Sequence, residues 1–276
     1  SEGNIVPVMM GSGINAQGFA YLLQAIDKYF PSPDKFECVG VDVSTAERFT
    51  AKYNDDVSLS ARVFKTVVDP FIGKYSLMKI CTGTLKPDTV IYNVNKDAEE
   101  KVQKVYVLRG KDVIEVPELK AGDIGAVAKL NVTQTGDTIA VRTAPIVYHK
   151  PKISTPYTYM AYAAKTKGDE DKISSALAKM MDEDLTLRSV SDTENRQTLL
   201  YGIGEQQLEV VVSKLQARYK VDIVLSKPKF AFRETLRKKV EAQGKYKKQS
   251  GGHGQYGDVK MSFEPSGDLE TPYVFE

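Results

Sequence analysis

Hydrophobic positions near the start of the chain predict one strand followed by one helix. Residues 4–9 form a short apolar run (Asn-Ile-Val-Pro-Val-Met), which is typical of a buried strand. Gly11-Ser12-Gly13 then turns the chain into a predicted helix over residues 17–29, whose apolar positions keep helical spacing: Phe19, Leu22, Leu23, Ile26 and Phe30. Pro31-Ser32-Pro33 ends this helix. Because one strand and one helix cannot enclose a core, we expect residues 1–34 to be the end of a larger domain.

Between residues 60 and 147 the hydrophobic period changes to that of short β-strands. Turn signals such as Asp69-Pro70 and Thr135-Gly136-Asp137 separate the apolar runs. The predicted strands cover residues 61–68, 75–81, 89–94, 103–107 and 124–130. Many short strands without a helical period predict a closed antiparallel β-barrel, which we assign to residues 35–150.

Residues 151–227 alternate between the two periods in the order βαββαβ. Strands are predicted over residues 155–163, 186–191, 197–201 and 221–225. Helices are predicted to begin near Asp169 and after Gly204, each with one apolar face: Ile173, Leu177, Met180 and Met181 in the first, and Leu208, Val211, Val212, Leu215 and Tyr219 in the second. This order is typical of a ferredoxin-like α+β domain.

The last stretch, residues 228–276, combines a glycine-rich loop with local positive charge. Residues 249–258 read Gln-Ser-Gly-Gly-His-Gly-Gln-Tyr-Gly-Asp, and a strand is predicted at 259–263. Two acids, Glu234 and Glu241, stand against seven basic residues before the loop: Arg233, Arg237, Lys238, Lys239, Lys245, Lys247 and Lys248. Glycines let a partner's backbone approach closely, and the positive charge favours phosphate. A flexible linker is the alternative, but such linkers are Gly/Ser repeats without Gln and Tyr.

Composition sets limits on the class of protein. The hydrophobic content of 42%, the charged content of 27% and the net charge of +2 leave any nucleic-acid contact to local patches. Cys38 and Cys81 are isolated, and His149 and His253 do not complete a metal site, so we expect no metal and a reducing, cytoplasmic setting. The sequence contains no apolar run as long as a membrane span and no signal peptide.

A phosphate-binding P-loop is absent from the sequence. Such a loop needs G-x-x-x-x-G-K-[ST], in which the lysine neutralises phosphate and the hydroxyl holds Mg²⁺. The three Gly-Lys pairs, Gly73-Lys74, Gly110-Lys111 and Gly244-Lys245, are each followed by Tyr or Asp. We therefore expect no catalytic residue and no bound cofactor in this chain.

Several stretches, in chain order, resemble bacterial elongation factor G. Residues 7–13 (Pro-Val-Met-Met-Gly-Ser-Gly) are similar to the last guanine-recognition loop of its GTPase domain, and residues 69–74 (Asp-Pro-Phe-Ile-Gly-Lys) and 83–85 (Gly-Thr-Leu) are similar to its second domain. Residues 202–210 (Gly-Ile-Gly-Glu-Gln-Gln-Leu-Glu-Val) are similar to the helix start of its third domain. Residues 227–236 resemble the junction between its third and fourth domains, and residues 249–257 resemble the opening of the fourth domain. The resemblance covers the whole chain in the family's domain order.

The resemblance implies a multidomain fold with partial flanking domains. Residues 1–34 would be the C-terminal strand and helix of a GTPase domain, 35–150 a translation-factor β-barrel, 151–227 a ferredoxin-like third domain and 228–276 a truncated start of the fourth domain. Because that start would lack its partner strands, we expect residues 233–276 to be poorly ordered or paired with another copy.

The function implied is that of the ribosome-binding portion of a translation factor. The full-length parent would bind GTP and Mg²⁺ and couple GTP hydrolysis to the translocation of tRNA and mRNA. Its partners would be rRNA and the tRNA–mRNA pair in the decoding region, and the chain would be monomeric. The chain alone, without a P-loop, would not hydrolyse GTP.

The resemblance also assigns site residues. Gly11, Ser12 and Gly13 would form the guanine loop, with the N–H groups near Ser12 and Gly13 facing the base oxygen, although a tight strand-to-helix turn is an equal alternative. Lys74 would face small-subunit rRNA, unless it is a solvated lysine of the barrel rim. Tyr256 is expected to pack beneath the fourth-domain loop. The RNA-facing residues of that region would be Lys245, Lys247, Lys248, Gly251, Gly252, His253, Gly254 and Gln255.

Two positions depart from the family's pattern. Gly13 stands where the family usually has Ala, and a backbone contact survives that change. Gln207 stands where the family typically has His, which makes a ribosomal-protection or ribosome-recycling paralogue of the same architecture an alternative. A stand-alone RNA-binding module is a further alternative. Asn95-Lys96-Asp97 resembles the guanine-specificity motif N-K-x-D, but Ala98 takes the place of its Asp, so the match is attributed to chance.

Overall fold

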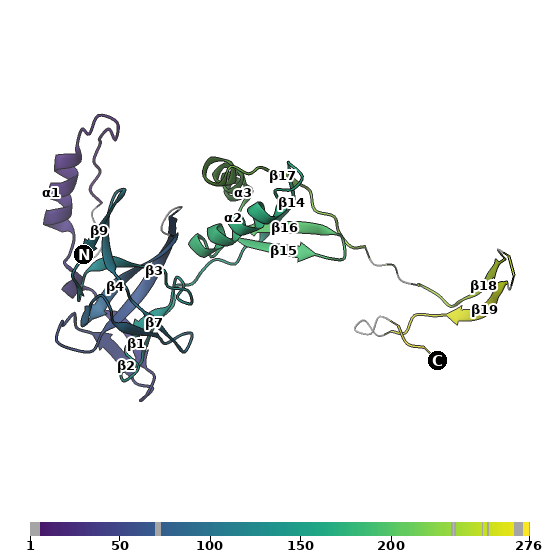
Figure 1. Ribbon diagram of the computed structural model, residues 1–276, viewed down its shortest axis with the longest axis horizontal. Coiled ribbons are helices and arrows are strands. Elements are labelled where there is room, and N and C mark those ends of the chain that lie inside the picture. The colour runs from purple at the N-terminus through teal and green to yellow at the C-terminus, as the bar shows by residue number, and fades with distance from the viewer. Residues whose placement is uncertain are drawn as a thin grey trace. The chain divides into compact units, whose positions relative to one another are not determined.

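The computed structural model describes residues 6–69, 73–232, 234, 236–249, 251–252, 254–267 and 273–275 (Figure 1). Contacts divide the chain into two compact units, residues 1–191 with 198–227 and residues 192–197 with 228–276. The first unit contains a helix, a β-barrel and an α+β domain, and the second contains a β-hairpin. The chain is therefore multidomain, as the sequence predicts.

Helix α1 spans Phe19–Tyr29, inside the predicted helix. The strand predicted at residues 4–9 is wrong for its described part, because residues 6–11 lie outside regular structure and an isolated bridge joins Ser12 to Gln17 instead. A strand is stabilised by hydrogen bonds to a neighbouring strand, and no described strand pairs with this segment. The apolar side of α1 is likewise exposed, with Phe19 at 46% and Ile26 at 41%. A short 3₁₀ turn, Pro33–Lys35, leads to the barrel.

Eight antiparallel strands form the main sheet of the β-barrel, in the order β7-β6-β12-β3-β4-β11-β8-β9. Their bounds are β3 Ser60–Asp69, β4 Gly73–Thr82, β6 Val90–Asn93, β7 Ala98–Lys101, β8 Val105–Arg109, β9 Asp112–Val116, β11 Ile124–Ala128 and β12 Thr138–Ala140. All five strands predicted in this region are present. Alternate residues point into an apolar core that includes Val63, Met78, Ile80, Ile91 and Ile139.

Short strands complete the barrel domain. A second sheet has the order β13-β1-β2, with β1 Cys38–Asp42, β2 Arg48–Ala51 and β13 Ile146–Tyr148, and β5 Thr84–Leu85 pairs with β10 Leu119–Lys120. These strands were not predicted, because each is short and is defined by the strand with which it pairs. Gly40 is required in β1, since a Cβ there would lie 2.5 Å from the Val147 carbonyl oxygen.

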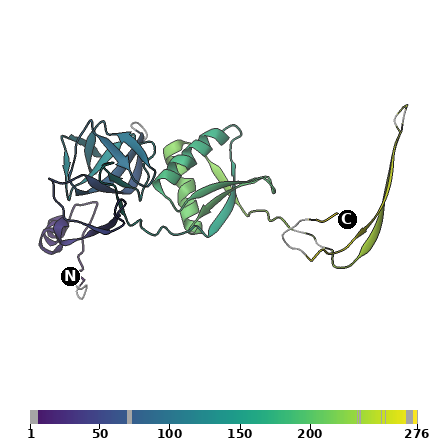
Figure 2. The ribbon, with the colours of Figure 1, turned by 90° about the horizontal axis from the view of Figure 1, so that it is seen from below.

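The ferredoxin-like domain is confirmed in its predicted element order. It consists of β14 Thr158–Ala164, α2 Glu170–Glu183, β15 Arg188–Asp192, β16 Gln197–Gly202, α3 Glu205–Lys214 with a π-helical end at Leu215–Tyr219, and β17 Ile223–Ser226. The sheet order is β15-β16-β14-β17, and Figure 2 shows both helices on one face of it. Ile173, Leu177, Leu200, Leu208 and Leu215 fill the space between helices and sheet. Among the described residues, no helix is long and apolar enough to cross a membrane.

The second unit differs from its prediction. β18 (Val240–Lys248) and β19 (Gln255–Phe263) form an antiparallel hairpin that runs in continuous register from Val240 opposite Phe263 to Lys248 opposite Gln255. The expectation that this stretch lacks partner strands was therefore wrong, because its basic segment is itself the partner of the predicted strand. The sequence did not reveal β18 because its lysines and one glycine obscure the alternation of apolar and polar residues along the strand.

Gly83 provides a test of the barrel's packing. Its φ is +71°, and an added Cβ would lie 2.6 Å from the Val57 carbonyl oxygen and 2.7 Å from the Leu59 backbone. Gly110 has a similar φ of +63° but open space around it. We expect Gly110→Ala to lower the free energy of unfolding by about 1 kcal/mol and Gly83→Ala to lower it by at least about 2 kcal/mol more, measured by urea unfolding. Equal losses would contradict the close packing at Gly83.

Candidate nucleic-acid interface

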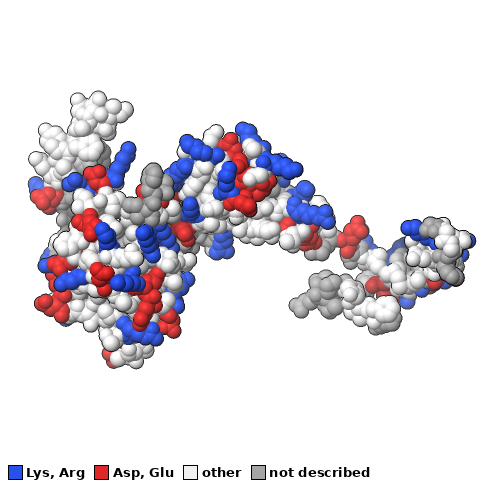
Figure 3. Space-filling model, in the orientation of Figure 1, with Lys and Arg blue, Asp and Glu red and all other residues white. Residues whose placement is uncertain are grey.

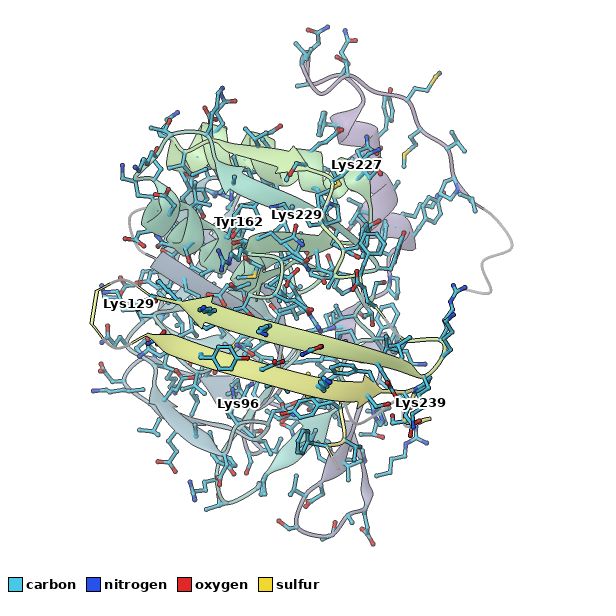
Figure 4. The ribbon with its side chains drawn as sticks, turned by 90° about the vertical axis from the view of Figure 1, so that its right-hand side faces the viewer. Lys96, Lys129, Tyr162, Lys227, Lys229 and Lys239 are labelled. Atoms are coloured by element: carbon cyan, nitrogen blue, oxygen red, sulfur yellow. The ribbon has the colours of Figure 1, made fainter. Side chains whose placement is uncertain are left out.

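Alternation along β18 and β19 divides the hairpin into a polar and an apolar face. Directly paired residues of an antiparallel ladder point to the same side, and successive residues point to opposite sides. Figure 4 shows the two strands side by side. The polar face carries Gln243, Lys245, Lys247, Tyr256, Asp258 and Lys260, and the apolar face carries Val240, Ala242, Tyr246, Val259, Met261 and Phe263. The large side chains of the apolar face are between 36% and 55% exposed.

Asp258 organises the polar face. Its carboxylate accepts hydrogen bonds from Gln243 Nε2 at 2.7 Å and from the Tyr256 hydroxyl at 3.2 Å, and Lys245 Nζ lies 3.8 Å away. Lys245 also lies over the Tyr256 ring, 5.6 Å from its centroid. The prediction that Tyr256 packs beneath the loop is corrected, because the ring lies on the strand face at 62% exposure. The charge of Lys245 is thus partly neutralised by Asp258.

Lys247 and Lys248 lie at the turn end of the hairpin. Lys247 is opposite Tyr256 and Lys248 is opposite Gln255, so the two ammonium groups leave opposite faces. Both side chains are exposed, and neither has an ion-pair partner within the described part of the chain. They are the two lysines of this strand that are fully available to phosphate.

The glycines form the turn between the strands. Gly251 and Gly252 have φ of +71° and +77°, which only glycine adopts readily, and no atom lies within 4 Å of a Cβ placed on either. Gly254 ends the turn, and Gln255 is the first residue of β19 rather than a loop residue. His253 lies outside the described residues. The structure therefore brings Lys247, Lys248, Gly251, Gly252, Gly254 and Gln255 together; we call this set the hairpin tip.

Lys74 belongs to the first unit, on β4 of the barrel. It is half-buried and lines an open, mostly polar hollow of about 660 Å³, together with Gln103, Lys129, Asn131, Gln134 and Asp182. Lys129 donates its backbone N–H to the Lys74 carbonyl at 2.9 Å. The sequence did not single out Lys129, which comes next to Lys74 only through the β4–β11 pairing. Residues 70–72 lie outside the described residues. In Figure 3 basic and acidic residues are interspersed over the visible barrel surface.

The predicted guanine loop is a closed turn. The Ser12 N–H donates to the Gln17 carbonyl at 3.1 Å, and the Gln17 N–H donates back to Ser12 at 3.2 Å. A Cβ on Gly11 would lie 2.7 Å from the Gln17 oxygen, whereas the space around Gly13 is open. The Ser12 N–H is therefore already used by Gln17, and the guanine contact of Gly11, Ser12 and Gly13 stays a prediction. No group of three His, Cys, Asp or Glu side chains within the described ranges is arranged to hold a metal ion.

Gln207 has a structural role in the ferredoxin-like domain. Its amide Nε2 donates to Asp184 Oδ2 at 2.8 Å and to Thr186 Oγ1 at 2.7 Å, and its Oε1 accepts from the Ile203 N–H at 2.7 Å. The side chain thus ties the start of α3 to the loop after α2. Burial raises the pKa of Asp184, but hydrogen bonds from Thr186 and Gln207 outweigh it and hold that pKa below its ordinary value.

The lowered pKa makes the stability of this domain depend on pH. A carboxyl whose pKa is lower in the folded state stabilises the fold above its unfolded pKa, and the contribution is lost as pH falls through the folded value. We expect the free energy of unfolding to fall below about pH 4 and the fall to be shallower in Asp184→Asn, measured by urea unfolding at a series of pH values. Asp171→Asn, at an exposed position of α2, is the control. Parallel curves for wild type and Asp184→Asn would contradict the assignment.

Comparisons with known proteins agree with this architecture. Three family models match the chain in order: elongation factor G domain 2 over residues 58–142, elongation factor G domain III over 153–227 and elongation factor G domain IV over 228–276. A crystal structure of a protein from Thermus thermophilus is 32% identical, with a TM-score of 0.67 over 92% of this chain. The match covers 36% of that solved chain. The chain therefore belongs to the elongation factor G family of translation factors and carries, in order, sequence of that family's second, third and fourth domains.

Proposed function

We propose that this chain is the ribosome-binding portion of an elongation-factor-G-like factor, whose full-length parent couples GTP hydrolysis to the movement of tRNA and mRNA. Membership of the family supports the general role in protein synthesis. The hairpin tip is the observation that supports contact with RNA, because two lysines without an ion-pair partner among the described residues stand beside a turn that contains Gly251, Gly252 and Gly254. GTP and Mg²⁺ are proposed for the parent's GTPase domain, because the sequence of this chain has no P-loop.

The chemistry of the hairpin tip suits an RNA backbone better than a particular base. An ammonium group is a compact point charge that binds phosphate without directional specificity. The glycines allow the turn to approach a sugar–phosphate chain closely. Gln255 offers both a donor and an acceptor to a 2′-hydroxyl or a base edge. The tip is therefore proposed to contact the tRNA–mRNA pair in the decoding region of the ribosome.

A second RNA contact is proposed on the barrel. Lys74 and Lys129 line the same polar hollow, so their charges act on one neighbourhood of the surface. The amide groups of Gln103, Asn131 and Gln134 add donors for phosphate or ribose oxygens. Asp182 reduces the positive potential there, so this contact is expected to be weaker than that of the hairpin tip. Small-subunit rRNA is the proposed ligand.

Salt dependence tests the RNA-binding role. Each lysine–phosphate contact releases counterions, so the logarithm of the affinity for bacterial ribosomes is expected to fall linearly with the logarithm of the salt concentration. We expect Lys247→Ala/Lys248→Ala to reduce that slope by roughly 1 for each lysine and to weaken binding, measured by filter binding or co-sedimentation at several salt concentrations.

A matched variant within the same hairpin controls for the loss of charge. Lys239 is ion-paired with Glu264 at 3.3 Å, and Lys260 lies on β19 away from the turn. Lys239→Ala/Lys260→Ala therefore removes two charges without touching the hairpin tip, and its slope is expected to stay closer to that of the wild type. Equal slopes for the two double variants would overturn the role of the tip. An affinity independent of salt would overturn the electrostatic role altogether.

The chain alone is expected not to hydrolyse GTP. The sequence has no P-loop, and the Ser12 N–H of the predicted guanine loop is occupied by Gln17. Phosphate release from GTP, followed without ribosomes, should equal that of buffer. Turnover that rises in proportion to the concentration of the purified chain would show that this expectation is wrong.

A further inference from the structure

A cluster of polar side chains lies in the interior of the barrel domain, between its two sheets. The Tyr53 hydroxyl lies 3.2 Å from Cys38 Sγ, and the Cys81 thiol donates to the Lys79 carbonyl at 3.7 Å. Cys38, Cys81 and Tyr148 pack in one buried cluster. The Tyr148 hydroxyl lies 2.6 Å from Ser60 Oγ. The translation role proposed above uses none of these groups.

The two thiols belong to one buried cluster although they lie on different sheets. Cys38 is on β1 and Cys81 is on β4, and both pack in one cluster with Ala51 and Ile146. They are free thiols and the only two cysteines of the chain. Cys38 is 8% exposed and Cys81 is fully buried, so a small reagent reaches Cys38 first.

The surroundings make the two thiols unequal. The hydrogen bond from Cys81 lowers the pKa of Cys38 against the effect of burial, and the Tyr53 hydroxyl and the positive charges of Lys79 and Arg62 lower it further. The same hydrogen bond to Cys38, together with burial, raises the pKa of Cys81, and only Tyr148 and Arg62 oppose it. Burial raises the pKa of both Tyr53 and Tyr148, so these hydroxyls stay protonated as donors. The surroundings therefore favour the thiolate at Cys38 and the protonated thiol at Cys81.

We propose that Cys38 and Cys81 are a redox site that a hydroperoxide such as hydrogen peroxide converts to an intramolecular disulfide. The Cys38 thiolate attacks one peroxide oxygen, an S–O bond forms as the O–O bond breaks, and hydroxide leaves. The Cys81 sulfur then attacks the resulting sulfenic acid, giving up its proton, and water leaves as the S–S bond forms. Two thiols lose two electrons and two protons, and one hydrogen peroxide becomes two waters.

The disulfide would have a structural consequence. It would join β1 of the three-stranded sheet covalently to β4 of the main barrel sheet, two strands with no direct backbone pairing between them. A cross-link between distant positions restricts the unfolded chain and raises the stability of the folded one. Cycles of oxidation and reduction would then alter how firmly the three-stranded sheet is held.

The test is oxidation of the full chain with hydrogen peroxide, followed by intact mass and peptide mapping without reductant. The expected result is a mass lower by two hydrogen atoms and a peptide containing Cys38 linked to one containing Cys81, both reversed by dithiothreitol. The midpoint of thermal unfolding should rise in the oxidised form. If both thiols stay free under conditions that oxidise the exposed methionines, the proposal is overturned. A disulfide between two copies of the chain, or sulfonic acid at Cys38 with Cys81 still free, would overturn it as well.

Variants separate the roles of the two thiols. In Cys81→Ser, oxidation should stop at the Cys38 sulfenic acid, which dimedone traps. In the wild type, equal trapping of sulfenic acid at the two cysteines would overturn the assignment of Cys38 as the attacking group. Tyr53→Phe removes a donor to the thiolate, so alkylation of Cys38 at neutral pH should slow by about threefold or more. Tyr157→Phe, at a residue 77% exposed, is the matched control and should react at the wild-type rate. Peptide mapping of the wild type decides the proposal even if Cys81→Ser fails to fold.

Discussion

Antiparallel backbone pairing is the constraint on which the rest of this structure depends. It places alternate residues on opposite faces, and so decides which side chains enter a core and which meet solvent. In the barrel, β4 illustrates the consequence: Met78 and Ile80 are fully buried, while Lys79 between them is partly exposed. In the hairpin the same rule sorts lysines from apolar residues along one strand. Register thus determines the core and the charged surface together.

The helices and the ferredoxin-like domain could be predicted from the sequence because their signal is local. The apolar stripe of α2 repeats within one segment, so Ile173, Leu177 and Met180 reveal the buried face without knowledge of any partner. The short strands β1, β2 and β13 offer no such signal, since each is defined by the strand it meets. The hairpin was missed for a similar reason: the alternation of β18 becomes visible only once Val240 is placed opposite Phe263.

The candidate site was predictable in its composition but not in its electrostatics. The lysines of β18 are evident in the sequence, yet Lys245 is held by Asp258, which is far along the chain and comes opposite it only through the register of the hairpin. Lys129 joins Lys74 in the same way. Gln207 looked like a departure with functional meaning, whereas the structure gives it three hydrogen bonds that hold two loops together. In each case a contact between distant segments decides the role.

The barrel interior holds polar groups in two ways, and the difference has chemical consequences. Asp137 is almost fully buried, but Asn93, the Gln134 N–H and Lys150 Nζ all donate to it, so its charge is compensated by groups that keep their protons. The Cys38–Cys81 cluster is instead built from groups that can each gain or lose a proton. A buried cluster of that kind settles its charge on one member, because the low dielectric of the core penalises a second charge nearby. The hydrogen bonds from Cys81 and Tyr53 lower the pKa of Cys38, and the charges of Lys79 and Arg62 lower it further, so a negative charge is favoured on the thiol that solvent can reach. A polar group inside the barrel must have a partner. At Asp137 the partners stabilise a fixed charge, whereas at Cys38 the partners favour the reactive form of the thiol.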